Sequence, residues 1–241
     1  MAGPAKSGIV LDSRVVGVGI AAAAISAAIL GVFMWMVPNA AAREEKAACR
    51  GLRGDLPLNP ALCNGGNCSM PTPAPDFVAL DYKGQKVKLS DFRGRVVLLN
   101  FWASWCGVCK TEKPSIKALA ENLGSDDFVV ITLASDHTWT DILGALVDTF
   151  APGTRPKGEV TFEQAFAAYQ KALPKGTPFQ VFIDPPKGDG NIGAITASWG
   201  IKAVPESALI DRAGNLRAYF VNKRDWTSNV AETCIQSVIN E

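Results

Sequence analysis

Apolar residues are distributed unevenly along this chain, and the longest apolar run lies near its start. Residues 15–37 (VVGVGIAAAAISAAILGVFMWMV) contain no charged side chain. As a helix that rises about 1.5 Å per residue, this run reaches roughly 35 Å, which is enough to cross a hydrocarbon layer of about 30 Å. The apolar part of a signal peptide is usually only about 7–15 residues long. We therefore predict an uncleaved transmembrane helix at residues 15–37, with a cleaved leader ending near residues 40–42 and a buried helix of a soluble protein as the alternatives.

The charges that flank this run give a mixed signal about orientation. Lys6 and Arg14 precede it, whereas four basic residues follow within the next twenty positions, which argues against export of the C-terminal part. That rule weakens when a long domain follows the span. All six cysteines come after the run, and cysteine-rich chains favour oxidising compartments. We expect residues 1–14 in the cytoplasm and the rest in the periplasm or another extracytoplasmic space of a bacterial inner membrane.

The remaining sequence divides into a tether and a compact domain. Residues 38–73 are Ala-rich and then dense in Pro and Gly, which predicts an extended or looped tether. Residues 74–241 alternate between strand-like and helix-like patterns, so we predict an α/β domain, a three-layer sandwich with a mixed central sheet and helices on both faces. Strands are predicted at 95–102, 128–133 and 179–183, hairpins at 77–89 and 207–221, and helices at 110–123, 139–150, 161–173, 191–199 and 226–240.

Composition excludes several classes of function. The chain has 241 residues, with 24 Lys and Arg against 23 Asp and Glu, so it lacks the basic excess of a nucleic-acid-binding protein. A single His disfavours His-rich metal sites and a Ser-His-Asp hydrolase. We therefore expect no nucleic-acid partner and no metal. Separately, we expect a monomer.

The chemistry concentrates in the motif SWCGVCK at residues 104–110. It follows a predicted central strand and begins a predicted helix, where unpaired N–H groups and the helix dipole favour a thiolate at Cys106. Cys109 lies about one turn further and can close a disulfide with Cys106. A structural zinc site needs four ligands, typically two such pairs, and the chain has only one CxxC. The pair is therefore interpreted as a redox-active disulfide that needs no dissociable cofactor.

Three separated motifs resemble one protein family. LNFWASWCGVCKTEKP at 99–114 is preceded by APDF at 74–77 and followed by GIKAVPESALIDRAGNL at 200–216. Together they are similar to the membrane-anchored thioredoxin-like proteins of the TlpA/ResA/DsbE type, which are bacterial thiol:disulfide oxidoreductases of the cell envelope. The resemblance covers roughly residues 74–241 and implies a thioredoxin-like fold.

The resemblance assigns roles to individual residues. Cys106 matches the exposed attacking thiol and Cys109 the buried resolving thiol. Trp105 matches the aromatic residue beside the attacking thiol. Pro205 matches the proline that is cis and faces the pair, and Val204 before it would offer its backbone to an extended client strand. Two further aromatic or proline positions also match: Trp102 at the end of the strand and Pro114 within the helix.

Two acidic positions refine the comparison. Cytosolic thioredoxins carry an acid on the strand six residues before the first Cys, where this chain has Asn100. The envelope branch has instead a Glu six residues after that Cys, which corresponds to Glu112, a candidate for handling the proton of Cys109. Its neighbours Lys110 and Lys113 leave open a solvated surface position. Glu206, which follows Pro205, resembles the cytochrome c maturation members and is a candidate substrate contact.

The other four cysteines are candidates for structural disulfides. Cys63 and Cys68 flank the sequence NGGN, whose two Gly residues permit a tight turn, so these two cysteines could pair. Cys49 would then pair with Cys234. Four cysteines allow three pairings, among which sequence does not choose. Cys234 lies in an apolar segment and also fits a buried, unpaired position.

The resemblance also implies partners. Clients would be apocytochrome c or the copper-site proteins of oxidase assembly, and an upstream membrane thiol donor of the DsbD type would supply electrons. Two other functions are the alternatives. A peroxidase of the related peroxiredoxin type needs Thr three residues before the attacking Cys, and this chain has Ala103 there. A copper-delivery or copper-binding protein is disfavoured because such relatives use CxxxC with a His, whereas this chain has CxxC. A helical insertion at about 145–178 and the loop residue His137 have no assigned role.

Overall fold

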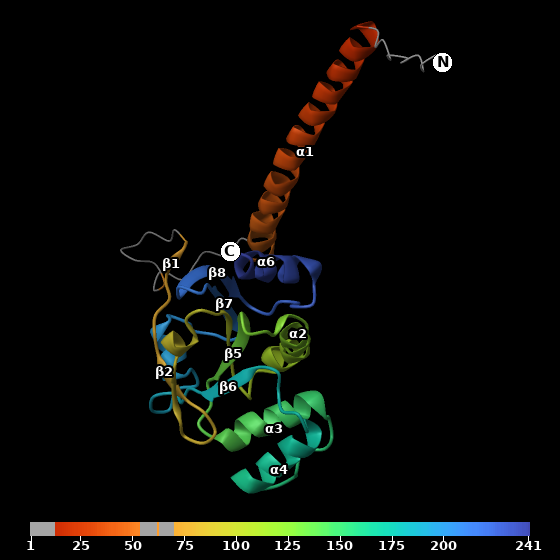
Figure 1. The fold of residues 1–241 in the computed structure, drawn as a ribbon. Coiled ribbons are helices and arrows are strands. Elements are labelled where there is room, and N and C mark those ends of the chain that lie inside the picture. The colour runs from red at the N-terminus through yellow and green to blue at the C-terminus, as the bar shows by residue number, and fades with distance from the viewer. Residues whose placement is uncertain (1–12, 54–61, 63–69) are drawn as a thin grey trace, which may run out of the picture. The chain divides into compact units, whose positions relative to one another are not determined.

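The computed structural model describes residues 13–53, residue 62 and residues 70–241. Two compact units can be distinguished, one ending at Glu44 and one running from Glu45 to the C-terminus. The thin grey trace in Figure 1 marks the residues that are not described.

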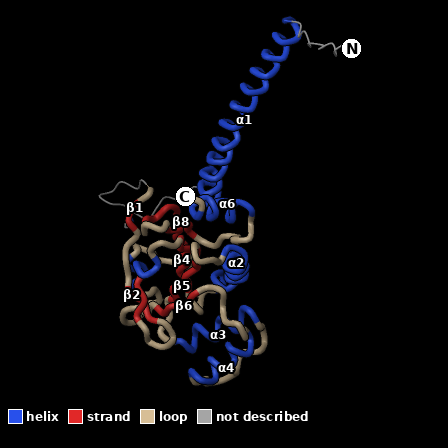
Figure 2. Tube along the Cα trace, in the orientation of Figure 1, coloured by secondary structure: helices blue, strands red, loops and turns tan. Residues whose placement is uncertain are grey.

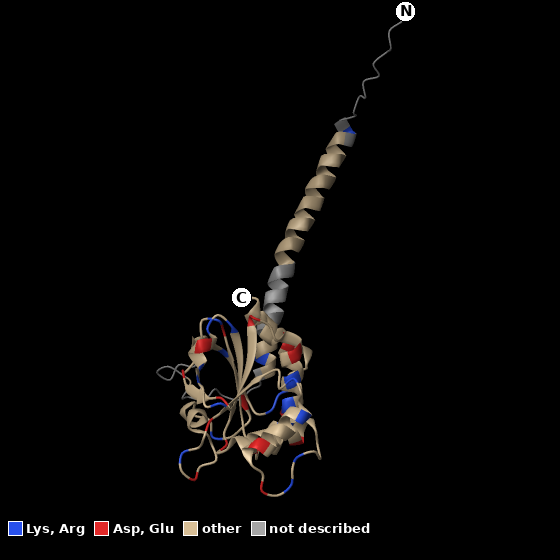
Figure 3. Cartoon of the chain, turned by 60° about the horizontal axis from the view of Figure 1, so that its bottom comes forward, with Lys and Arg blue, Asp and Glu red and all other residues tan. Residues whose placement is uncertain are grey.

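The first unit is helical. Helix α1 spans Ser13–Arg53, and its segment Val16–Met36, with a mean hydropathy of 2.3, is long and apolar enough to cross a membrane. Figure 3 shows this segment free of the red and blue that mark charged residues. The helix agrees with the predicted span and is compatible with a membrane anchor.

The end of α1 corrects one prediction. Residues 38–53, expected as extended or looped tether, are helical. The reason is compositional, because Ala, Glu, Lys and Arg dominate this stretch and are strong helix formers. Leu52 at its end is buried in the core of the second unit. Residues 54–61 and 63–69 of the predicted tether lie outside the described part of the chain.

The second unit is built on one mixed sheet. In the described residues it has eight strands in the order β1-β8-β7-β4-β5-β6-β2-β3. Strand β4 runs parallel to β5, which runs parallel to β6, while the other pairs are antiparallel. The strands are β1 (Thr72–Pro73), β2 (Val78–Leu80), β3 (Lys86–Lys88), β4 (Val96–Trp102), β5 (Phe128–Ala134), β6 (Gln180–Ile183), β7 (Glu206–Ile210) and β8 (Asn215–Val221).

Helices cover both faces of this sheet, as Figures 1 and 2 show. One apolar cluster joins the sheet to three of them, and a second cluster fills the other face with the 3₁₀ helix and the segment around α5. The helices of the first face are α2 (Gly107–Leu123), α3 (Trp139–Phe150) and α6 (Asn229–Ile239); α4 (Phe162–Ala172) packs on α3, and the opposite face carries η2 (Leu89–Phe92) and α5 (Ala194–Ser198).

Strand β4 shows how sequence periodicity builds these layers. All seven of its residues are buried, and successive side chains of a strand point to opposite faces. Leu98 and Trp102 therefore join the α2 side, whereas Leu99 and Phe101 join the other. Asn100 lies between Leu98 and Trp102 in this alternation, so a polar side chain is placed on the apolar face below α2.

The predicted elements agree with the structure at this level. The three-layer α/β sandwich is confirmed, including both hairpins, and the helices expected at 161–173 and 226–240 become α4 and α6. Helix α6 begins later than expected because the Ser228 side chain accepts a hydrogen bond from the backbone N–H of Ala231 and so caps it. That α4 is an insertion stays a prediction.

Candidate active site

The disulfide between Cys106 and Cys109 lies at the junction between the end of β4 and the start of α2. Cys106 is the N-cap residue of α2, and its Sγ accepts a hydrogen bond from the backbone N–H of Cys109 at 3.0 Å. The two sulfur atoms are bonded, with their Cα atoms 5.2 Å apart. This position exposes Cys106 to the unpaired N–H groups and the positive end of the helix dipole, which stabilise a thiolate there after reduction.

The two sulfurs differ in access. Cys106 is 7% exposed and Cys109 is 1% exposed. Cys106 matches the position expected of an attacking thiol, although in the disulfide form it is far more covered than the expectation of an exposed thiol suggested. Part of the cover is the carbonyl oxygen of Val204, which lies 3.5 Å from Cys106 Sγ.

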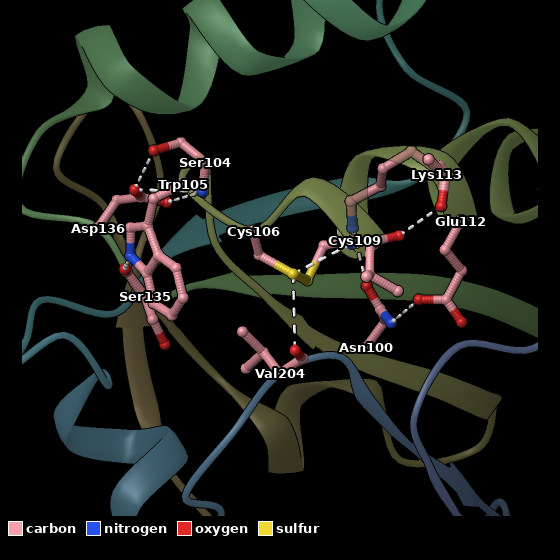
Figure 4. Close-up of a disulfide and its surroundings, with 12 residues drawn as sticks. Asn100, Ser104, Trp105, Cys106, Cys109, Glu112, Lys113, Ser135, Asp136 and Val204 are labelled. Carbon is pink, nitrogen blue, oxygen red and sulfur yellow. Dashed lines mark hydrogen bonds between the residues drawn. A yellow bond between two sulfur atoms is a disulfide. The ribbon is translucent and has the colours of Figure 1, made fainter.

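The loop that carries Val204 faces the disulfide (Figure 4). The peptide bond between Val204 and Pro205 is cis, as the resemblance implied. Because β7 begins at Glu206 and pairs with β4, the sheet fixes this loop next to the start of α2. The structure thus brings Val204 to the redox pair from nearly one hundred residues away in sequence.

Trp105 and Val108 form an apolar rim beside the disulfide. Their side chains are 53% and 54% exposed. The indole N–H of Trp105 donates to the backbone oxygen of Ser135 at 3.3 Å, which holds the ring against the end of β5. Large exposed apolar side chains next to a reactive site are typical of surfaces that bind partners.

Asp136 fixes the loop that leads into Cys106. Its carboxylate accepts hydrogen bonds from the backbone N–H and the hydroxyl of Ser104. Burial raises the pKa of Asp136 above its usual value, and the hydrogen bonds from Ser104 oppose this effect. The neighbouring His137 is exposed.

Glu112 is fully buried below the disulfide, so the alternative of a solvated surface position is wrong. Its Oε1 accepts hydrogen bonds from the backbone N–H of Arg224 and the indole N–H of Trp226, both at 2.9 Å. Its Oε2 accepts one from the side-chain amide of Asn100 at 3.3 Å. Three donors therefore support a carboxylate that apolar packing alone would disfavour.

Lys113 is also fully buried, which the sequence analysis missed. Its ammonium donates to Asn100 Oδ1 at 2.8 Å and lies 4.1 Å from the centre of the Trp102 ring. Burial lowers the pKa of Lys113 to about 7, and the charge of Glu112 opposes this shift. Figure 4 shows Lys113, Asn100 and Glu112 together on the Cys109 side of the disulfide.

A sequence signal for these burials exists. Cys109, Glu112, Lys113 and Ile116 follow the spacing i, i+3, i+4, i+7, which places them on one face of a helix. Since Cys109 and Ile116 belong to the core face, the two charged residues between them belong to it as well. The partners Arg224 and Trp226 carry no such local signal.

Pro114 lies within α2, as predicted. Glu206, the candidate substrate contact, accepts a hydrogen bond from the hydroxyl of Tyr219 on β8. Burial raises the pKa of Glu206, and the hydrogen bond from Tyr219 opposes this effect. The structure thus gives Glu206 a partner within the sheet.

Of the other cysteines, Cys49 and Cys234 form a disulfide that joins the end of α1 to α6, with their Cα atoms 4.6 Å apart. Cys63 and Cys68 lie outside the described residues. In the described part of the chain, His, Cys, Asp and Glu side chains do not gather in groups of three or more that could hold a metal ion.

A cavity of about 450 Å³ lies away from the disulfide. Aromatic side chains from the β2–β3 hairpin, α3 and α4 line it, among them Tyr82, Trp139, Phe166 and Tyr169. The predicted insertion therefore contributes to a surface separate from the redox pair.

A disulfide between cysteines three residues apart, at the junction of a central strand and a helix and opposite a cis-proline loop, defines a thioredoxin-like dithiol/disulfide protein. Comparison with known proteins specifies the family: the Redoxin family model matches residues 71–235, and the chain belongs to this family.

Individual relatives agree with this assignment. The thiol-disulfide oxidoreductase ResA of Bacillus thuringiensis subsp. konkukian is 29% identical over 143 residues, which cover 59% of this chain and 64% of the relative. The chain thus spans less than two thirds of the length of this relative. The thioredoxin-like protein YneN of Bacillus subtilis is 40% identical over 78 residues, 32% of this chain and 46% of that protein.

A solved structure confirms the thioredoxin-like fold. A thiol:disulfide interchange protein DsbE from Chlorobium tepidum aligns with a TM-score of 0.51 at 27% identity, covering 71% of this chain and 98% of that one.

Proposed function

We propose that this protein is a thiol:disulfide oxidoreductase that reduces disulfides in client proteins with Cys106 and Cys109. The observation that carries the proposal is the Cys106–Cys109 disulfide at the N-terminus of α2. Membership of the Redoxin family and the similarity to ResA and DsbE support the same activity.

The reaction begins with the reduced protein. The Cys106 thiolate attacks one sulfur of a client disulfide, a mixed disulfide forms, and the other client sulfur leaves as a thiolate. Cys109 then attacks Cys106 Sγ, and its proton passes to the carboxylate of Glu112. The second client thiolate leaves, so two electrons have moved from the protein to the client and the Cys106–Cys109 disulfide is restored.

Client recognition would use the surface around Cys106. The exposed rings and methyl groups of Trp105 and Val108 offer apolar contact. Val204, whose carbonyl oxygen approaches Cys106 Sγ, offers backbone groups to an extended client segment, as in other strand-addition complexes. Glu206 lies next to this loop and is the candidate polar contact.

We further propose an envelope location and clients with paired cysteines. Helix α1 would anchor the protein in a bacterial inner membrane with the second unit in the periplasm or another extracytoplasmic space. Clients would be apocytochrome c or copper-site proteins of oxidase assembly, because the resemblance to the TlpA/ResA/DsbE type implies them. A membrane thiol donor of the DsbD type would reduce the disulfide again.

Trapping of the mixed disulfide tests the activity and identifies the client. In a Cys109→Ser variant the second step is blocked, so the client stays bound to Cys106. We expect mixed disulfides with envelope proteins that are released by dithiothreitol and are absent in a Cys106→Ser, Cys109→Ser double variant. Absence of any adduct in the single variant, together with no insulin reduction by the unmodified protein, would contradict the proposal.

A further inference from the structure

Two opposite charges are buried at adjacent positions of α2. Glu112 and Lys113 are neighbours in sequence, and neighbours in sequence do not face each other on a helix. The structure nevertheless connects them, because the side chain of Asn100 on β4 reaches both.

The amide of Asn100 is oriented to suit both charges. Its oxygen accepts from the Lys113 ammonium at 2.8 Å, and its nitrogen donates to Glu112 Oε2 at 3.3 Å. The same nitrogen donates to the hydroxyl of Ser207 at 3.0 Å, and Ser207 lies opposite Asn100 on the neighbouring strand β7, so this bond fixes the amide plane. Asn100 thus holds a cation at its negative end and an anion at its positive end.

Among the described residues, the other side chains in contact with the Lys113 ammonium are uncharged. Trp102 of β4 and Phe179, which precedes β6, present their rings to the ammonium. Cys109 lies one turn earlier on the same helix face. Arg224 meets Glu112 through its backbone N–H, while its guanidinium donates to the backbone oxygens of Leu52, Asn222 and Lys223.

A buried lysine is costly, and an apolar residue of similar length would pack in the same place without loss of hydration. The charge is therefore best explained by what it does for Glu112. We propose that Lys113 is the counter-ion of Glu112, bridged to it by Asn100, and that it sets the pH range in which Glu112 accepts the proton of Cys109. This inference rests on the proposed function, and it makes Lys113 and Asn100 positioning residues of the resolving step.

The physical basis is the cost of an isolated buried charge. Without the ammonium, the carboxylate of Glu112 loses a compensating charge in a water-poor site, and its protonated form gains in stability. A protonated Glu112 has no capacity to take the Cys109 proton. The pKa of Lys113 is lowered to about 7, so near neutral pH Lys113 changes between a charged form, which compensates the charge of Glu112, and a neutral form, which does not.

The test separates the two steps with an aromatic disulfide, dithionitrobenzoate, on the full chain in detergent. The reduced Cys106–Cys109 pair releases one coloured thiolate when Cys106 attacks and a second when Cys109 resolves the adduct. The rate of the second phase is measured by stopped flow across pH. A Cys106→Ser variant supplies the background from other thiols, and near-ultraviolet circular dichroism shows that each variant is folded.

Lys113→Met is expected to slow the second phase about tenfold at about pH 6.5 and to move its midpoint upward by about one pH unit. The first phase should change less than about twofold, because Cys106 attacks without Glu112. Asn100→Leu, which keeps both charges and removes the bridge, is expected to shift the midpoint in the same direction. Lys117→Met is the matched control, since Lys117 lies one turn further on α2 and pairs with Glu121 at the surface.

An unchanged midpoint in the folded Lys113→Met variant overturns the inference, and Asn100→Leu decides if Lys113→Met does not fold. A Glu112→Gln variant distinguishes this inference from the proposed role of Glu112 on which it rests. If Glu112→Gln leaves the second phase unchanged, the proposed role of Glu112 fails and this inference fails with it. If Glu112→Gln slows the second phase while the two other variants keep the wild-type midpoint, only the counter-ion inference fails.

Discussion

The two described disulfides of this protein make the same bond in very different surroundings. Cys106 and Cys109 are three residues apart at a helix N-terminus, beside an exposed apolar rim and above a buried pair of charges. Cys49 and Cys234 are 185 residues apart and join the end of α1 to the middle of α6 among apolar side chains. The environment, and not the bond, indicates which pair exchanges electrons and which one holds elements together.

Removal of each pair should separate these roles most clearly in activity. We expect Cys106→Ala to lower insulin reduction by more than about a thousandfold, because the attacking sulfur is lost. The double variant Cys49→Ala, Cys234→Ala should keep the rate within about twofold of the unmodified protein. A large loss of activity in that folded double variant would show that the second pair takes part in exchange.

Stability should show the opposite order. Loss of the Cys49–Cys234 disulfide is expected to lower the free energy of unfolding of the second unit by about 2–4 kcal/mol, because the bond closes a long loop in the unfolded chain. The Cys106–Cys109 bond closes only a short loop, so its loss should lower the free energy of unfolding by less. Urea titrations of both variants in detergent measure this, and equal losses would contradict the comparison.

The charges below the redox pair predict a smaller, pH-dependent effect. Lys113 has a pKa of about 7 when folded and about 10.5 when unfolded, so the unfolded chain binds more protons between these values. Its contribution to the free energy of unfolding therefore rises with pH across this range. Relative to Lys113→Met, the unmodified protein should gain about a few kcal/mol in stability between about pH 7 and about pH 10. A difference that stays constant with pH would show that Lys113 is not buried as described.

Much of the fold and the redox pair could be predicted from local patterns. Strand β4 is a continuous apolar run, and CxxC after such a strand has few other interpretations. The burial of Glu112 and Lys113 was harder to predict, because the surrounding sequence KTEK suggests a solvated face. The helix spacing from Cys109 to Ile116 contained the signal, but the reason that burial is tolerated lies in Asn100 and Trp226, which belong to other elements.

The end of α1 was mispredicted for a related reason. Residues 38–53 precede a Pro- and Gly-rich segment, and both stretches were assigned to one tether. The first stretch is rich in Ala, however, and forms helix. Its pairing through Cys49 depends on a residue near the other end of the chain, and local propensity contains no information about such a contact.

The order in which the chain is synthesised determines when Glu112 can form its hydrogen bonds. The chain leaves the ribosome from its N-terminus, so Cys106 and Cys109 are synthesised before Arg224 and Trp226. Only when those two residues emerge does Glu112 obtain its backbone and indole donors. The reactive sulfurs therefore come first, and the carboxylate proposed to accept their proton gains these donors only after residue 226 has been added.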